Sequence, residues 1–145
     1  MTPLRRLDHV AVAVKDTDRA LEYFAGRLGL EVESTEVIEA PHVRLTYLDA
    51  GSIYIQLVEP LDDESPIALY LAEHGEGLHH ICFSAEDVEG TAAQLAEPGS
   101  PDVTLGSGRG RPSAFVPGEI HHGVRVEVTG FDPVADVEER RGVLD

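Results

Sequence analysis

Four polar residues at matched spacing interrupt otherwise apolar stretches of this 145-residue chain. His9 and Gln56 are 47 positions apart, and so are His80 and Glu127. Imidazoles, a carboxylate and an amide oxygen together suit divalent ions such as cobalt, manganese, nickel or zinc. A polar side chain buried without a partner destabilises a protein by about 1–3 kcal/mol, which one shared ion would avoid. We therefore predict that these four residues bind one divalent metal ion.

The segments that carry the two histidines are copies of one pattern. Residues 7–14 and 78–85 are both apolar, strand-forming runs with a histidine in the third position. An acidic turn follows each run, and then a segment with apolar residues at helical spacing. Alternating or β-branched runs complete each copy. In the second copy we expect strands at 78–85, 103–105, 113–116 and 123–129. We expect a helix at about 87–96 and a glycine-rich loop at 106–112.

This order predicts an α+β fold in which two tandem βαβββ modules form a curved mixed sheet around a central metal-binding cleft. We expect a single domain over residues 1–145. Its parts are module one at about 5–60, a linker helix within about 61–77, module two at about 78–130, and a C-terminal tail at 131–145.

Composition limits the partners that this chain can have. It carries 11 basic and 27 acidic residues, for a net charge of −16, which disfavours nucleic acid and anionic membranes. No apolar run approaches the roughly 20 residues that cross a bilayer. A single cysteine, Cys82, and an N-terminus without a leader pattern favour the cytoplasm. We expect Cys82 to be a small buried residue and the partner to be a small molecule.

Several runs of the chain resemble the vicinal oxygen chelate superfamily, which includes the glyoxalases and bleomycin resistance proteins. Within it the chain is most similar to the methylmalonyl-CoA epimerases. The runs that carry this resemblance are residues 7–16, 55–61, 65–68, 75–83, 114–115 and 123–127.

The resemblance implies a metal-dependent epimerase or isomerase, commonly a homodimer, that acts on an acyl-CoA or a related 1,3-dicarbonyl compound. It implies His9, Gln56, His80 and Glu127 as metal ligands, with Glu127 near enough to exchange protons. The ion would stabilise the enolate that forms when the α-proton leaves. Metal-containing alternatives on the same scaffold are a glyoxalase-type isomerase, a dioxygenase or a biosynthetic enzyme for a natural product. A non-catalytic antibiotic-binding protein is a further alternative.

One position departs from the epimerase pattern. Where the epimerases usually carry a glutamate before the third strand, this chain has Ala40. The neighbouring Glu39 and His42 are therefore our candidates for the catalytic base, with Glu127 as the second acid–base group.

Three further polar groups have less definite roles. Strand alternation predicts that His79 points to the face opposite His80. Arg109 and Arg111 lie in the glycine-rich loop, which is either solvated or in contact with the phosphates of CoA. His121 and His122 are expected to be exposed or to face the substrate.

Overall fold

The computed structural model describes residues 4–131, so the predicted tail lies outside the described residues except for Phe131. The chain divides into two compact units. One unit is His9–His80, and the other joins the described residues up to Asp8 with those from Ile81 onward. The expected linker helix lies within the unit His9–His80.

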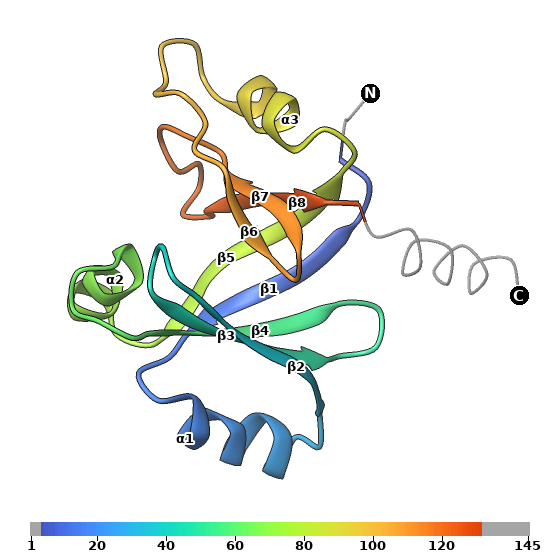
Figure 1. The fold of residues 1–145 in the computed structure, drawn as a ribbon, viewed down its shortest axis with the longest axis vertical. Coiled ribbons are helices and arrows are strands. Elements are labelled where there is room, and N and C mark those ends of the chain that lie inside the picture. Colours follow the sequence, from blue (N-terminus) through green and yellow to red (C-terminus); the bar gives the residue numbers. More distant parts are fainter. Residues whose placement is uncertain (1–3, 132–145) are drawn as a thin grey trace, which may run out of the picture. The chain divides into compact units, whose positions relative to one another are not determined.

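The first unit contains four strands and three helical segments (Figure 1). Strand β1 pairs with β4 in parallel, and β2, β3 and β4 pair antiparallel in succession. The elements of this unit are β1 (Leu7–Ala13), α1 (Thr17–Leu21), the π-helix η1 (Glu22–Arg27), β2 (Glu31–Ile38), β3 (Val43–Asp49), β4 (Tyr54–Pro60) and α2 (Pro66–His74).

Capping residues define where the helices of the first unit begin. The Asp16 carboxylate accepts a hydrogen bond from the backbone N–H of Arg19 at the start of α1. The Ser65 hydroxyl accepts one from the N–H of Ala68 at 3.2 Å, and α2 then opens with a proline. The expected helix after β1 is present, but its second half is wound as a π-helix, which spacing did not predict.

The two faces of this sheet are covered by different helices. On one face α2 packs against β1, β3 and β4 in a buried cluster that includes Tyr47, Val58 and Leu71. On the other face α1 and η1 pack through Leu21 and Phe24. A sheet that is covered on both faces explains why its central strands are rich in apolar residues.

The second unit repeats the arrangement, with shorter strands after its helix. Strand β5 (Gly77–Ala85) pairs with β8 (Val126–Gly130) in parallel, and β8, β7 (Arg111–Phe115) and β6 (Gly106–Gly108) pair antiparallel. Helix α3 (Val88–Leu95) packs against the sheet. The α+β fold of two βαβββ modules is thereby confirmed, with the strand order β2-β3-β4-β1 in the first unit and β5-β8-β7-β6 in the second.

One strand prediction was wrong. Residues 103–105 do not form a strand; the strand is β6, within the segment expected to be a loop. It forms a hairpin with β7 through a two-residue turn, Arg109 and Gly110, whose φ angles are 55° and 71°. Such turns match the twist of paired strands, so the glycine-rich run supports pairing rather than a loose loop.

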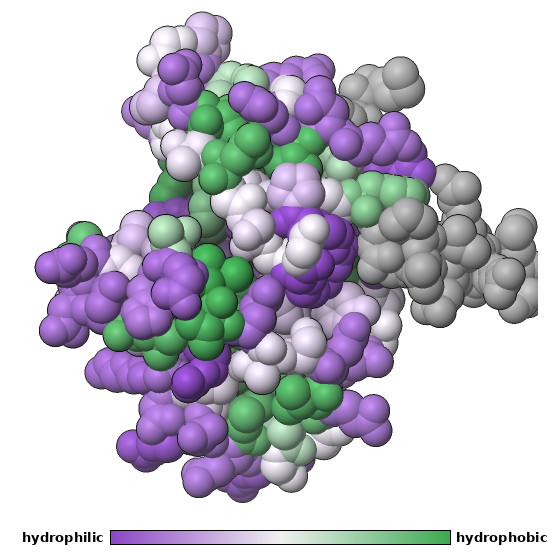
Figure 2. All heavy atoms as spheres, viewed as in Figure 1, coloured by the Kyte–Doolittle hydropathy of each residue, from purple (hydrophilic) through white to green (hydrophobic). Residues whose placement is uncertain are grey.

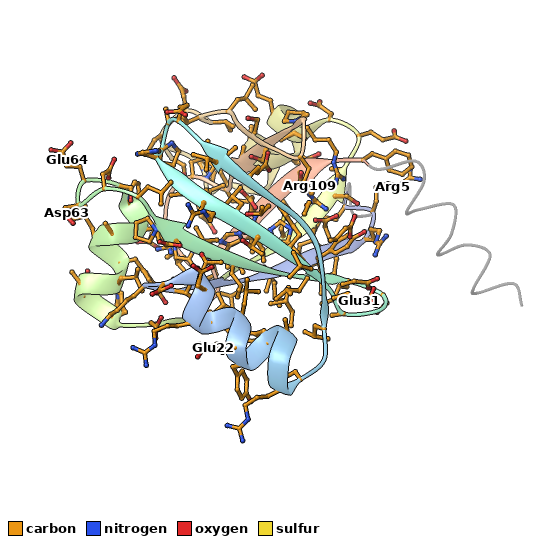
Figure 3. The ribbon with its side chains drawn as sticks, turned by 60° about the horizontal axis from the view of Figure 1, so that its bottom comes forward. Arg5, Glu22, Glu31, Asp63, Glu64 and Arg109 are labelled. Carbon is orange, nitrogen blue, oxygen red and sulfur yellow. The ribbon has the colours of Figure 1, made fainter. Side chains whose placement is uncertain are left out.

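The surface carries the acidic excess of the chain. Figure 3 shows Glu22, Asp63 and Glu64 directed outward from the strands, and all three are exposed. On the face seen in Figure 2, hydrophobic residues form separate groups among hydrophilic ones. In the described part of the chain, the structure has no helix that is both long and apolar enough to cross a membrane.

Candidate functional site

His9 and Gln56 lie side by side on neighbouring strands of the first unit. Ala11 of β1 is the register partner of Gln56 on β4, and His9 lies two positions before Ala11, so its side chain is on the same face. The exposed fractions of His9 and Gln56 are 2% and 4%. Both residues thus lie on strands, as the sequence predicts, and both are buried.

Tyr47 orients both side chains, and sequence reasoning missed it. The Gln56 amide nitrogen donates a hydrogen bond to the Tyr47 hydroxyl at 2.8 Å, and the His9 and Tyr47 rings meet edge-on with centroids 5.8 Å apart. Tyr47 is itself 2% exposed. A tyrosine four positions into an apolar strand could have been flagged as a group that needs a polar partner when buried.

The orientation of the Gln56 amide leaves its oxygen available. Because the amide nitrogen is bonded to Tyr47, the Oε1 atom points elsewhere, and it is buried without a hydrogen-bond partner among the described residues. An unsatisfied buried acceptor destabilises a fold by about 1–3 kcal/mol, so its retention calls for an explanation. An amide oxygen is also a metal ligand, and this observation fits the predicted donor set.

The two histidines of the predicted donor set are neighbours. The rings of His9 and His80 have centroids 5.5 Å apart at an interplanar angle of 72°, and His80 is 6% exposed. Their proximity within one unit is what a shared ligand would require.

His79 does not occupy the separate environment that strand alternation predicted. It is 9% exposed, and its Nδ1 lies 2.7 Å from the Nδ1 of His80, which is a hydrogen bond between two ring nitrogens. In each ring Nδ1 is the nitrogen nearer to the backbone. The Nδ1 atoms of these two adjacent residues can therefore come within hydrogen-bond distance of each other. The ring of His79 also packs edge-on against Tyr70 of α2.

In the second unit, Glu127 lies beside a buried thiol. Glu127 on β8 is half-buried and is the register partner of Cys82 on β5, which is fully buried as expected. Burial raises the pKa of the Cys82 thiol well above its ordinary value, and the nearby charges of Glu127 and Asp8 raise it further. The thiol therefore stays protonated, and it acts as a neutral neighbour of the carboxylate.

The same unit contains a buried ion pair that sequence reasoning missed. Arg109 at the tip of the β6–β7 hairpin donates to the Asp8 carboxylate, and Arg111 lies 4.0 Å from it. Figure 3 marks Arg109. Their side chains are only 14% and 18% exposed, so neither arginine belongs to a solvated loop.

The four candidates for a base or a substrate contact near turns have different surroundings. Glu39 is exposed in the turn after β2, and His42 is half-buried just before β3. His121 and His122 are exposed as expected, with His121 3.6 Å from Glu97.

A further carboxylate was missed in the sequence. Glu36 on β2 is half-buried and is the register partner of Leu45 on β3. Partners in an antiparallel pair share a face, and Tyr47, two positions beyond Leu45, contacts Gln56 on that face. Glu36 therefore lies on the face of the sheet that carries Gln56. Glu36 and Ile38 are half-buried and alternate with the exposed Thr35 and Val37, and this two-residue period is the signal that could have found Glu36.

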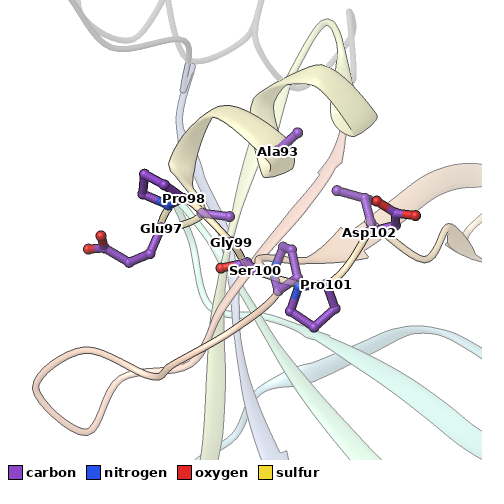
Figure 4. A pocket seen from close by; sticks show the side chains of 10 residues that line it. Ala93, Glu97, Pro98, Gly99, Ser100, Pro101 and Asp102 are labelled. Atoms are coloured by element: carbon purple, nitrogen blue, oxygen red, sulfur yellow. The ribbon is translucent and has the colours of Figure 1, made fainter.

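A hollow of about 420 Å³ lies in the second unit and has different chemistry (Figure 4). It is lined by Ala93, Glu97, Ser100, Asp102 and neighbouring prolines, among others. None of its lining residues is an imidazole, a thiol or a basic group. The hollow is therefore not a candidate for the predicted metal chemistry.

The residue types of the predicted centre suit a metal. The His9 and His80 imidazoles are buried in the first unit, and the Glu127 carboxylate is half-buried in the second, and both residue types are common ligands of divalent metals. Gln56 adds the buried amide oxygen described above.

Comparison with known proteins places these residues in a family context. Residues 8–115 match the model of the glyoxalase/bleomycin resistance protein/dioxygenase superfamily. An ethylmalonyl-CoA/methylmalonyl-CoA epimerase of Cereibacter sphaeroides is 33% identical over 130 residues, which cover 85% of this chain and 96% of that protein. An uncharacterised protein of Bacillus subtilis is 39% identical over 80 residues, which cover 55% of this chain and 57% of that protein.

A solved structure shows the same fold. A Streptomyces coelicolor methylmalonyl-CoA epimerase variant in complex with 2-nitronate-propionyl-CoA is 34% identical, with a TM-score of 0.74. The match covers 88% of this chain and 97% of that chain.

Proposed function

Because the chain belongs to the glyoxalase/bleomycin resistance protein/dioxygenase superfamily, we propose that it is a metal-dependent epimerase or isomerase. Its substrate in this proposal is a methylmalonyl-CoA-like acyl thioester that loses and regains its α-proton. The names of two similar proteins, both epimerases of methylmalonyl-CoA type, support this substrate class.

The proposed ligands are His9, Gln56, His80 and Glu127. The observation that carries the proposal is the buried Gln56 oxygen, which has no hydrogen-bond partner among the described residues and lies on the face of His9. The neighbouring rings of His9 and His80 support it. A divalent ion bound there would supply Lewis-acid stabilisation for the negative charge that develops on a carbonyl oxygen. The ligands differ in hardness, which leaves cobalt, manganese, nickel and zinc as candidates.

Epimerisation also needs groups that remove a proton from one side of the α-carbon and return one on the other. Glu127, in the second unit, is one of the two proposed proton-transfer groups. For the first unit we proposed Glu39 and His42 from the sequence, and the structure adds Glu36. The half-buried position of Glu36 on the Gln56 face favours it over the exposed Glu39.

Solvent exchange tests this proposal directly. Metal-loaded protein is incubated with methylmalonyl-CoA in D2O, and deuterium at the α-carbon is followed by mass spectrometry. We expect incorporation in the parent and a loss of at least about 10²-fold when the true base is neutralised, the usual contribution of a positioned base. The variants to compare are Glu36→Gln, Glu39→Gln, His42→Gln and Glu127→Gln. Metal analysis of each variant separates lost proton transfer from lost metal.

One observation favours a second candidate function. Among the described residues of His9–His80, no Asp or Glu is fully buried, so the first unit offers no acid that is enclosed as deeply as the imidazoles. This suits another metalloenzyme of the superfamily, such as a glyoxalase-type isomerase. Metal retention without deuterium incorporation would favour that enzyme class, and absence of metal in the purified and reconstituted protein would refute both. A homodimer and a cytoplasmic location stay predictions.

A further inference from the structure

We propose that His79 is a positioning residue that fixes the ring orientation and the tautomer of His80. The two Nδ1 atoms are 2.7 Å apart, and both side chains are buried, with exposed fractions of 9% and 6%. This inference rests on the proposed function, since it concerns how one of the proposed ligands is held.

The hydrogen bond between the two rings has only two neutral forms. If His79 donates, the Nδ1 of His80 accepts, and the proton of His80 sits on Nε2, which then cannot bind a metal. If His80 donates from Nδ1, its Nε2 carries a lone pair and can be a ligand. Metal binding through Nε2 of His80 therefore requires His79 to be the acceptor. Metal-binding histidines generally donate their second N–H to such an acceptor, which fixes the ring and raises its basicity.

His79 is itself held in place by helix α2. The ring of Tyr70 meets that of His79 edge-on, with centroids 4.7 Å apart at 83°. The Tyr70 hydroxyl donates to the carbonyl oxygen of Leu78 at 2.9 Å, which anchors the tyrosine to the start of the same strand. Tyr70 of the linker helix thus contacts His79, and His79 in turn contacts the proposed ligand His80.

Two variants separate the acceptor from the bulk of the side chain. His79→Asn places an amide oxygen where Nδ1 lies and keeps an acceptor, whereas His79→Leu fills similar space without one. Apo protein of each variant is titrated with Co²⁺ against a competing chelator, and its visible absorption spectrum is recorded. We expect His79→Leu to weaken Co²⁺ affinity by about 10- to 100-fold, as for other partners of ligating histidines. His79→Asn should stay within a few-fold of the parent and keep its spectrum.

A second measurement reads the tautomer itself. Long-range ¹H–¹⁵N spectra of the Zn²⁺-loaded full-length chain should show the His80 proton on Nδ1 and the His79 proton on Nε2. A proton on Nε2 of His80 would overturn the inference. Thermal unfolding of the apo variants shows whether His79→Leu also perturbs the fold.

The outcomes separate this inference from the proposed metal site. If the parent binds Co²⁺, His80→Ala loses it, and His79→Leu binds as tightly as the parent, then only the role of His79 is refuted. If the parent binds no Co²⁺, or His80→Ala binds it as the parent does, then the metal site and this inference both fail. Equal losses in His79→Leu and His79→Asn would also refute the acceptor role.

Discussion

Replacing Asp8 by alanine should be among the most destabilising single changes in the second unit. The Asp8 side chain is 4% exposed, and it pairs with Arg109 and lies 4.0 Å from Arg111. Without the carboxylate, both largely buried guanidinium groups lose an anionic neighbour. Removal of one partner from a buried ion pair typically costs about 3–5 kcal/mol.

The change can be measured on the apo protein by thermal unfolding, followed by circular dichroism, with a chelator present. For a chain of this length, about 3 °C of melting temperature corresponds to 1 kcal/mol, so we expect a loss of about 10–15 °C. Glu86→Ala is the matched control, because the Arg5–Glu86 pair in the same unit is 3.0 Å long but 71% exposed at the glutamate. Exposed pairs contribute at most about 1 kcal/mol.

A double variant tests the reasoning more strictly. Replacing the pair by Asp8→Leu and Arg109→Met together removes both charges of the pair and fills their space with apolar side chains. It should therefore recover most of the stability that Asp8→Ala loses. A loss below about 1 kcal/mol in Asp8→Ala, comparable to that of Glu86→Ala, would show that the pair is not the buried contact described here.

Three further changes test other contacts. Because the pKa of the Cys82 thiol is raised, it stays protonated in the folded chain while the unfolded thiol ionises above its ordinary pKa of 9.0. This contribution to stability is fully present below that pH, and it is lost as the pH rises toward the pKa of the folded thiol. The urea midpoint of the parent should therefore fall more steeply above pH 9 than the midpoint of Cys82→Ala. Equal slopes for the two proteins would contradict the raised pKa. Ser65→Ala removes the cap that accepts from the Ala68 N–H, and it should lower the free energy of unfolding by about 1 kcal/mol in urea titrations. Thr17→Val removes the hydroxyl that donates to Glu59 at 2.6 Å, and calorimetry should show a loss of about 1.5–3 kcal/mol, whereas Thr17→Ser should be milder.

The repeat made most of the fold predictable. The apolar runs around His9 and His80 and the helical spacing after each were enough to place two modules, because burial imposes its periodicity on the residues. Capping residues such as Asp16 and Ser65 marked where helices begin, since their short oxygen-bearing side chains satisfy the first backbone N–H groups.

The failures came from features that periodicity does not encode. Arg109 adopts a positive φ, which arginine rarely does, so the hairpin of β6 and β7 resembled a flexible loop in the sequence. The contact of His79 with His80 depends on ring rotation and on Tyr70, 9 and 10 positions earlier in the chain. Pairing of Asp8 with Arg109 joins residues 101 positions apart, and no local pattern links them.

Each module has a hydrophobic cluster of its own, centred on Tyr47 and Val58 in one and on Ala92 and Val128 in the other. Gln56 and Glu127 occupy matching positions in the two copies of the pattern. A substitution at either position would therefore change the formal charge of the proposed ligand set while leaving the hydrophobic cluster of the other module unchanged.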